Sequence, residues 1–491
     1  MSNTKHIVII GGGLAGLSAG CYARASGFET TILEHGALGG VCTAWSRGPY
    51  TVDGCIHWLT GGPFERFYRE LGILPSVSTH VLEQFLSYRD LQSGVSVSVT
   101  RDLAALGKAL TELAPGDADE IARLIAGSED FASVTPPLDA PQLRTLHDAL
   151  SQLWEMRGHI KTLAHFRKPL GVWISEHISD PTLRRVFTRL APTDAPALVL
   201  LMVLGYLGRG YLSRPDGGTA RFRDALIATY QRLGGVARTG TTVSEVLVHD
   251  DRARGVVLSD GSMIDADIVI STASGPETVL QLLGGHYGAA AFRKRLQSWK
   301  MFEPVVLASF GVTTPLAGLP ATQIIDGLAP FDVGGHSTKH LYIRLYNDDP
   351  SFAPPGHCVV QVMANTTYDY WAKRGTSYGD AKTRVAEMLW SQLAEQLPIA
   401  SSRAMTDVAT PLTFWNHARS FRGAFEGWLP SSEAMFSGVD KTLPGLADFY
   451  MAGQWVEPGG GVPTAVMSGR QVMQLVCKQA GMPFSVPIRV D

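Results

Sequence analysis

A chain of 491 residues is too long for one hydrophobic core and is expected to form two or three domains. Hydrophobic residues make up 45% and charged residues 18%, a balance that excludes a disordered chain, and the net charge of -3 gives no attraction for nucleic acid. The five cysteines have no Cys-x-x-Cys spacing, so neither a zinc site nor a disulfide framework is predicted, and a cytoplasmic location is expected.

The chain begins with an apolar strand, a glycine-rich turn, a helix and a second strand. The strand is predicted at His6–Ile10, the helix ends near Ser26, and the second strand runs over Glu29–Leu33 with Glu34 directly after it. This order is typical of dinucleotide-binding folds, in which a pyrophosphate lies at the N-terminus of the helix.

Each residue of this fingerprint has a physical role. Gly11 allows a tight turn, Gly13 lets the pyrophosphate approach the backbone, and Gly16 lets the helix pack closely on the strand. Glu34 is expected to accept hydrogen bonds from the ribose hydroxyls of the adenosine.

Two later stretches return to the same kind of fold. A Gly39-Gly40 pair follows Glu34, and the middle of the chain predicts a helix at 222–233 and strands at 243–248, 255–258 and 268–271. Near the C-terminus a strand that begins at Phe449 leads to Gly459-Gly-Gly461 and to a helix that ends near Ala480. This second glycine turn before a helix predicts a further place that can accept an anion.

With these motifs the chain resembles the family of phytoene desaturases, carotenoid isomerases and retinol saturases, within the amine oxidase superfamily. The matching segments are 6–62, 211–275 and 449–480. The resemblance implies an α/β fold with a Rossmann-like FAD-binding domain of the glutathione-reductase type and a discontinuous α+β substrate domain. The FAD-binding domain is expected at 1–75, 211–290 and 440–491, and the substrate domain at 76–210 and 291–439. One departure is that Ala37 and Val41 stand where the family has arginines beside the glycine pair.

The resemblance also implies which residues bind FAD. They are Gly11, Gly13, Leu14, Ala15, Gly16, Glu34, His35, Gly39, Gly40, Val41, His57, Trp58, Val243, Thr272, Gly453, Gln454, Gly461, Val462 and Pro463.

His57 is the candidate for catalysis, because in this superfamily its segment runs beneath the flavin ring. A histidine with a pKa near neutrality could donate a proton there or orient a substrate; the alternative is a structural histidine that bonds the flavin or the backbone. Amine oxidases carry a lysine at the flavin, but residues 304–307 offer none, although Lys300 is close in sequence. No metal is expected, and the pair His336 and His340 is interpreted as part of a loop.

The predicted function is therefore desaturation, saturation or isomerisation at C–C or C=C bonds of an apolar, polyene or isoprenoid-like substrate. The alternatives are a flavin amine oxidase and a non-redox binding protein with the architecture of GDP-dissociation inhibitors. Apolar residues at helical spacing between Leu143 and Leu163 have basic neighbours, so this segment either packs on its own domain or contacts a membrane surface. The oligomeric state is left open.

Overall fold

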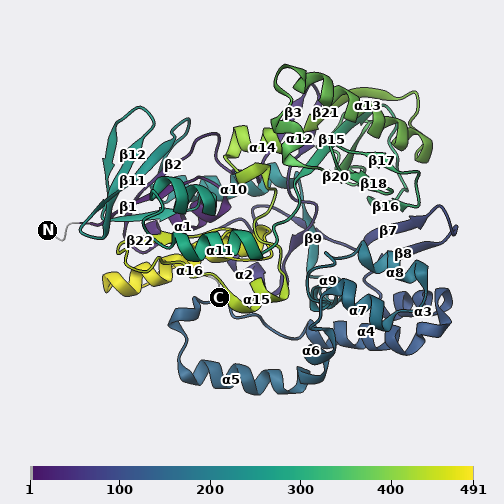
Figure 1. Cartoon of the computed structure of the whole chain (residues 1–491), viewed down its shortest axis with the longest axis horizontal. Coiled ribbons are helices and arrows are strands. Elements are labelled where there is room, and N and C mark those ends of the chain that lie inside the picture. The colour runs from purple at the N-terminus through teal and green to yellow at the C-terminus, as the bar shows by residue number, and fades with distance from the viewer. Residues whose placement is uncertain (1–3, 490–491) are drawn as a thin grey trace.

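The computed structural model describes residues 4–489 and is built around a five-stranded parallel sheet (Figure 1). The strand order is β10 (Val236–Arg238), β2 (Glu29–Leu33), β1 (His6–Ile10), β14 (Ile268–Ser271) and β22 (Phe449–Met451). The central strands are apolar along most of their length because both faces of a parallel sheet are buried. The sheet therefore joins segments from the beginning, the middle and the end of the chain.

Three helices follow strands of this sheet or pack beside them: α1 (Leu14–Ala25), α10 (Gly218–Arg232) and α16 (Val462–Ala480). A β-carbon on Gly469 of α16 would lie 2.5 Å from the carbonyl oxygen of Ala15 in α1, so these two helices pack backbone to backbone. The predicted first helix and both N-terminal strands are confirmed. Helix α10 begins at Gly218 rather than at the predicted Phe222.

A small antiparallel meander lies beside the parallel sheet. It consists of β11 (Val243–His249), β12 (Arg252–Leu258) and β13 (Met263–Asp265). Between β12 and β13 the chain turns at Asp260 and Gly261.

A seven-stranded sheet forms the other large layer, at the upper right of Figure 1. Its order is β21 (Arg403–Ala409), β15 (Val305–Val312), β20 (Cys358–Asn365), β19 (Leu341–Leu345), β16 (Thr322–Asp326), β7 (Gln84–Asp90) and β8 (Ser96–Thr100). All neighbouring pairs are antiparallel except β16 and β7. Helices α13 (Tyr378–Gln396), α12 (Tyr368–Ala372) and α14 (Pro411–Ala418) lie around its upper end.

Residues 103–208 form a helical region below the seven-stranded sheet (Figure 1). Its helices are α3 (Leu103–Leu113), α4 (Ala118–Phe131), α5 (Leu146–Met156), α6 (Ile160–Phe166), α7 (Leu170–His177), α8 (Pro181–Thr188) and α9 (Leu198–Gly208). The most apolar stretch of the sequence forms α9, which packs in the core of this region. Among residues 4–489 no helix combines the length and the apolar character needed to cross a membrane.

Short strands connect these layers and position the candidate site. Strands β3 (Ala44–Arg47) and β4 (Tyr50–Asp53) form a hairpin, and β5 (Leu59–Thr60), β9 (Leu212–Pro215) and β6 (Thr79–Val81) form a small sheet. His57 lies in the connection between β4 and β5. The remaining helices are α2 (Glu65–Glu70), α11 (Ala289–Ser298) and α15 (Ser432–Ser437).

Candidate functional site: an FAD cradle beside a buried polar network

The glycine-rich turn between β1 and α1 is tightly packed, as the spacing of Gly11, Gly13 and Gly16 predicts. A β-carbon on Gly16 would overlap the carbonyl oxygen of Gly11, and the Thr272 hydroxyl donates to that same oxygen at 3.0 Å. A β-carbon on Gly13 would instead find its nearest neighbour 4.0 Å away, at Gly39 O. Gly16 is thus required by the protein's own packing, whereas Gly13 faces space that the protein leaves open.

Helix α1 presents its N-terminus to that space. Gly13 precedes the helix without a side-chain cap, and Leu14 and Ala15 form the first turn. Uncapped N–H groups at a helix start are hydrogen-bond donors for an anion, and the helix dipole adds partial positive charge. The donor set therefore fits a pyrophosphate.

Glu34 is fixed at the end of β2 by two backbone groups. Its carboxylate accepts from the N–H of Gly12 at 2.6 Å and from the N–H of Gly36 at 2.7 Å. Burial raises the pKa of this carboxyl, and the two backbone hydrogen bonds oppose that rise. Each oxygen retains a lone pair, so the side chain is oriented and still able to accept a ribose hydroxyl.

The glycine pair lies against the first turn and is contacted by an arginine. Gly39 N–H donates to Gly12 O at 2.8 Å, and a β-carbon on Gly40 would lie 3.3 Å from Gly13 Cα. A β-carbon on Gly39 would overlap the side chain of Arg223, which also donates to the Thr43 hydroxyl at 3.2 Å. Because the residues flanking the pair are not arginines, Arg223 of α10 is the guanidinium that the fold brings to this place; it was not predicted from the sequence.

The C-terminal segment completes the cradle. Gly453 N–H donates to the Ser468 hydroxyl at 2.7 Å, and a β-carbon on Gly453 would lie 3.6 Å from that of Ala15. Gly461 precedes α16 without a side-chain cap, and Pro463 lies in its first turn. Two uncapped helix starts therefore belong to neighbouring, packed helices.

Five other predicted residues lie around this cradle with roles of their own. His35 is bonded to the Thr242 hydroxyl and Asn416 O, and Val243 is buried at the start of β11. Val41 packs with an apolar cluster that includes Trp45, Phe414 and Phe425, and Gln454 lies against Gly427. Trp58 stacks edge-on against Phe85 and is partly exposed.

The loop that carries His57 is anchored to the start of α10. The buried Asp53 carboxylate accepts from the backbone N–H of Thr219 at 2.8 Å and of Cys55 at 3.0 Å. The Thr219 hydroxyl in turn accepts the Ile56 N–H at 2.8 Å. These bonds fix the backbone just before His57, so its side chain is positioned by the fold.

His57 is bonded to Gln361 of β20 in one defined tautomer. The Gln361 amide donates to Asp53 O at 2.8 Å, so its Oε1 is the atom that faces His57 Nε2 at 3.2 Å. That nitrogen therefore carries the proton, and Nδ1 is the basic atom. The ring also stacks on Tyr342 of β19, with centroids 5.8 Å apart.

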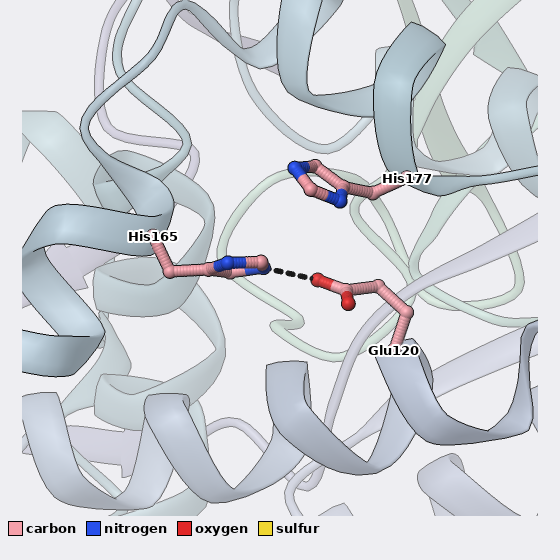
Figure 2. A group of neighbouring side chains, drawn as sticks. All are labelled: Glu120, His165 and His177. Carbon is pink, nitrogen blue, oxygen red and sulfur yellow. Dashed lines mark hydrogen bonds and ion pairs between the residues drawn. The ribbon is translucent and has the colours of Figure 1, made fainter.

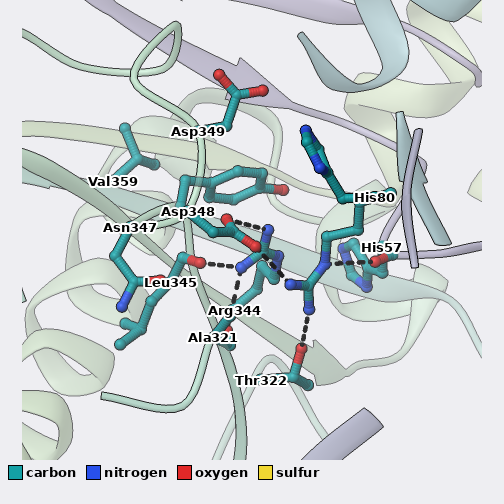
Figure 3. A network of polar contacts seen from close by, with 12 residues as sticks. His57, His80, Ala321, Thr322, Arg344, Leu345, Asn347, Asp348, Asp349 and Val359 are labelled. Atoms are coloured by element: carbon teal, nitrogen blue, oxygen red, sulfur yellow. Dashed lines mark hydrogen bonds and ion pairs between the residues drawn. The ribbon is translucent and has the colours of Figure 1, made fainter. Parts of the chain in front are cut away.

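Arg344 lies near His57 in Figure 3, and Arg214 Nε donates to the backbone carbonyl of His57 at 3.4 Å. Arg214 bonds the Thr322 hydroxyl at 2.9 Å, and Arg344 bonds Asp348 at 2.8 Å, an aspartate that Arg214 also contacts. Burial and the charge of Arg344 lower the pKa of His57 to about 4. The ring is then neutral at neutral pH, which differs from the near-neutral pKa on which the proton-donor hypothesis depended.

The lysine expected of an amine oxidase is not found on the corresponding strand. Strand β15 is buried along its whole length and contains no lysine. Lys300 extends toward solvent and pairs with Asp194 at 2.8 Å. Lys300 therefore forms an ion pair at the protein surface.

A second polar cluster lies in the helical region, with Glu120, His165 and His177 facing one another (Figure 2). Glu120 accepts from His165 Nε2 at 2.5 Å and also pairs with Arg123. The bond to His165 connects α4 to α6, and the ion pair with Arg123 compensates the negative charge of the carboxylate. A bound cation is therefore not needed to explain the cluster. His336 and His340 flank the short strand β18 (Ser337–Thr338) within their loop. The prediction of no metal stays a prediction.

The parallel sheet, the two uncapped helix starts and the oriented acid define a flavoprotein oxidoreductase, and its cofactor is FAD. The chain belongs to the family described as flavin containing amine oxidoreductase, whose model matches residues 14–477. The predicted family and the FAD-dependent enzyme class are confirmed.

Similar proteins span nearly the whole chain. A lycopene-forming phytoene desaturase of Pseudescherichia vulneris is 24% identical, with 96% of this chain and 99% of that protein covered. A 4,4'-diapolycopene oxygenase of Methylomonas sp is also 24% identical, with 96% and 98% covered. A solved oxidoreductase from Methanosarcina mazei shares the fold, with a TM-score of 0.61 at 19% identity and with 96% of this chain and 100% of that chain covered.

Proposed function

We propose that this protein removes, adds or relocates hydrogen at C–C or C=C bonds of an apolar, polyene or isoprenoid-like substrate, with FAD as its redox cofactor. The observation that carries the proposal is the near-complete alignment with a phytoene desaturase and a diapolycopene oxygenase. The uncharged strand β15 and the surface pairing of Lys300 support this reaction over amine oxidation. Bound FAD supplies acceptance or donation of hydride.

In this proposal, residues 1–75, 211–290 and 440–491 bind FAD, and 76–210 and 291–439 receive the substrate. The pyrophosphate lies at the starts of α1 and α16, and Glu34 accepts from the adenosine ribose. The predicted FAD contacts remain those named from the sequence, with Arg223 added beside Gly39. His57, neutral and held by Gln361, orients the substrate beside the flavin and does not donate a proton at neutral pH.

The test is anaerobic incubation of the purified holoprotein with a panel of polyenes, retinoids and unsaturated acids, while flavin absorbance and products are followed together. At least one polyene is expected to bleach the flavin or to yield an isomer. Putrescine and benzylamine serve as the contrasting substrates. Rapid bleaching by an amine, with no response to any polyene, contradicts the proposal.

We also propose that α5 and α6 lie on the surface of an anionic membrane, from which an apolar substrate is taken. Four large apolar side chains are exposed here: Leu146 (86%), Leu150 (65%), Trp154 (62%) and Ile160 (60%). The guanidinium of Arg157 lies 3.8 Å from the ring centroid of Trp154, so cationic and apolar groups share one face. Figure 1 shows α5 along the lower edge of the molecule. Exposed apolar groups with basic neighbours are typical of helices that lie at lipid interfaces.

Flotation with vesicles tests this contact. The protein is expected to float with vesicles of phosphatidylcholine and phosphatidylglycerol more than with phosphatidylcholine alone, since basic groups favour anionic lipid. Leu150→Asp combined with Trp154→Asp should abolish flotation, whereas Met263→Asp, at a side chain equally exposed on β13, should not. Equal flotation of all three proteins contradicts the assignment of the surface to α5.

A further inference from the structure

A carboxyl group on the loop between α14 and α15 lies against the C-terminal glycine turn. A β-carbon on Gly460 would lie 2.9 Å from both Cβ and Cδ of Glu426, so the Glu426 side chain rests on that turn. The next residue, Gly427, packs equally closely on Gln454 O. Glu426 is thus placed by residues 454–460, the segment that leads into the uncapped start of α16.

The segment of Glu426 also packs beside the glycine pair, because Phe425, the residue before it, shares an apolar cluster with Val41. The pKa of the Cys55 thiol is raised by hydrogen bonding to Cys42 and by burial, and negative charge on Glu426 adds to the rise. Cys42 comes two residues after Gly40 of the glycine pair, and Cys55 comes two residues before His57. Glu426 therefore lies between the C-terminal glycine turn and the segment of the glycine pair, and its charge acts on Cys55 in the loop that carries His57.

The carboxyl of Glu426 differs in its hydrogen bonding from the two buried acids around the cradle. Glu34 accepts two backbone N–H groups, and Asp53 accepts from Thr219 and Cys55. Within residues 4–489 no hydrogen bond or ion pair is found for Glu426, and its side chain is partly accessible, so the carboxyl faces space that the protein leaves open. A carboxyl without a protein partner beside a cofactor site is a candidate for chemistry.

Burial alone raises the pKa of Glu426 to about 7. Both its protonated and its ionised form are then populated near neutral pH, which is the condition that favours transfer of a proton by a side chain. His57, with a pKa of about 4, does not meet this condition.

We propose that Glu426 is the acid–base group of this enzyme and exchanges a proton with a substrate carbon beside the flavin. The inference rests on the proposed function. In the desaturating direction bound FAD would supply acceptance of the hydride from one C–H bond. The C–H bond on the neighbouring carbon breaks, its proton passes to the Glu426 carboxylate, and its electron pair forms the C=C bond. In the saturating direction reduced FAD would supply the hydride, and the electron pair of the C=C bond takes the proton from the protonated carboxyl.

The first test needs no substrate. The visible spectrum of bound FAD is recorded across about pH 5.5–8.5 for wild type, Glu426→Gln and Glu433→Gln, the last being an exposed carboxyl seven residues along the chain. Wild type and Glu433→Gln are expected to show a spectral transition with a midpoint at about pH 7, because a charge forms beside the flavin. Glu426→Gln, with its FAD content retained, should show none. A transition that persists in Glu426→Gln, or a flat wild-type titration, overturns the proposal.

The second test measures anaerobic flavin reduction by a responsive polyene. Glu426→Gln is expected to slow this step by about 10²–10⁴-fold and to remove the rise in rate with pH that a base produces. Wild-type rates in an FAD-replete Glu426→Gln protein overturn the acid–base role. If no polyene reduces wild type, the proposed function fails, and the spectral titration still decides whether Glu426 titrates beside the flavin.

Discussion

Gln361 holds His57 by accepting its Nε2–H at 3.2 Å while donating its own amide to Asp53 O at 2.8 Å. The pairing connects the seven-stranded sheet to the loop between β4 and β5 and fixes the tautomer of the imidazole. Burial and the charge of Arg344 lower the pKa of this ring to about 4. We therefore expect His57 to act by positioning a bound molecule and not by transferring a proton.

Substitution of His57 by glutamine is expected to leave FAD content unchanged and to lower turnover by less than about tenfold, since loss of a true acid or base costs about 10²–10⁴-fold. The pH dependence of turnover between about pH 6 and 8 should keep its wild-type shape, because a group with a pKa of about 4 does not titrate there. Parallel measurement of FAD content, turnover and the pH profile on one preparation checks this. If the pH dependence of turnover between about pH 6 and 8 disappears in His57→Gln, His57 is the proton donor.

Acid should destabilise the protein partly through the same residue. The pKa of His57 falls from about 6.5 in the unfolded chain to about 4 in the folded one, so the folded state binds fewer protons between these values. The free energy of unfolding should therefore decrease as the pH falls from about 6.5 to 4, by roughly 3 kcal/mol for this group. Urea unfolding at several pH values should show a shallower decrease for His57→Gln than for His249→Gln, whose side chain is exposed. Equal changes in the free energy of unfolding with pH for the two variants contradict the lowered pKa of His57.

Two glycines of the first turn should respond differently to alanine. Gly16→Ala is expected to destabilise the apoprotein, because its β-carbon overlaps Gly11 O. Gly13→Ala should leave apoprotein stability within about 1 kcal/mol of wild type while weakening FAD at least tenfold, since its methyl group enters only the space left for the cofactor. Thermal unfolding of apoprotein and FAD titration separate the two effects. Loss of stability in both variants would show that Gly13 serves the fold.

Glu34→Gln should weaken FAD binding by roughly 10- to 100-fold, because a hydrogen bond to a charged group contributes about 1.5–3 kcal/mol. Glutamine keeps one acceptor oxygen, so one of the two hydrogen bonds from the backbone N–H groups of Gly12 and Gly36 is retained, and we expect the turn to survive. Fluorescence titration of apoprotein with FAD gives the dissociation constant. An unchanged constant means that Glu34 orders the turn without contacting the ribose.

Arg223→Ala should also weaken FAD, by about tenfold or more, because it removes the guanidinium beside the glycine pair. Arg221→Ala is the matched control, since Arg221 lies two residues earlier on α10 and is exposed. The difference between the two variants should shrink at high salt. Equal FAD affinities at low salt contradict a phosphate contact.

Patterns that are local in sequence predicted the FAD-binding fold well. Strands β1 and β2 are bounded as predicted because a buried apolar run ends at glycine or at an acid, and α16 ends before Gly481. Helix α10 begins four residues early, where Gly217 and Gly218 adopt positive φ and bring Thr219 onto Asp53, a contact between residues 166 positions apart. Such a distant partner leaves no periodic signal near Phe222.

The site itself was less predictable, because its properties depend on distant neighbours. The low pKa of His57 comes from burial and from Arg344, a residue on another sheet. Arg223 reaches Gly39 only through the packing of α10. Among the described residues Glu426 has no hydrogen-bond or ion-pair partner, and no sequence pattern predicts that a side chain lacks one.

The central sheet places a constraint on how the enzyme is made. Its outer strand β22 begins at Phe449, and the helix that completes the cofactor cradle begins at Val462, so both leave the ribosome after the segments that they pack against. The ribosome must release the chain beyond α16 before the site can retain FAD. Nascent chains therefore expose one edge of β14 until β22 has emerged, and truncation before residue 449 should yield a colourless protein.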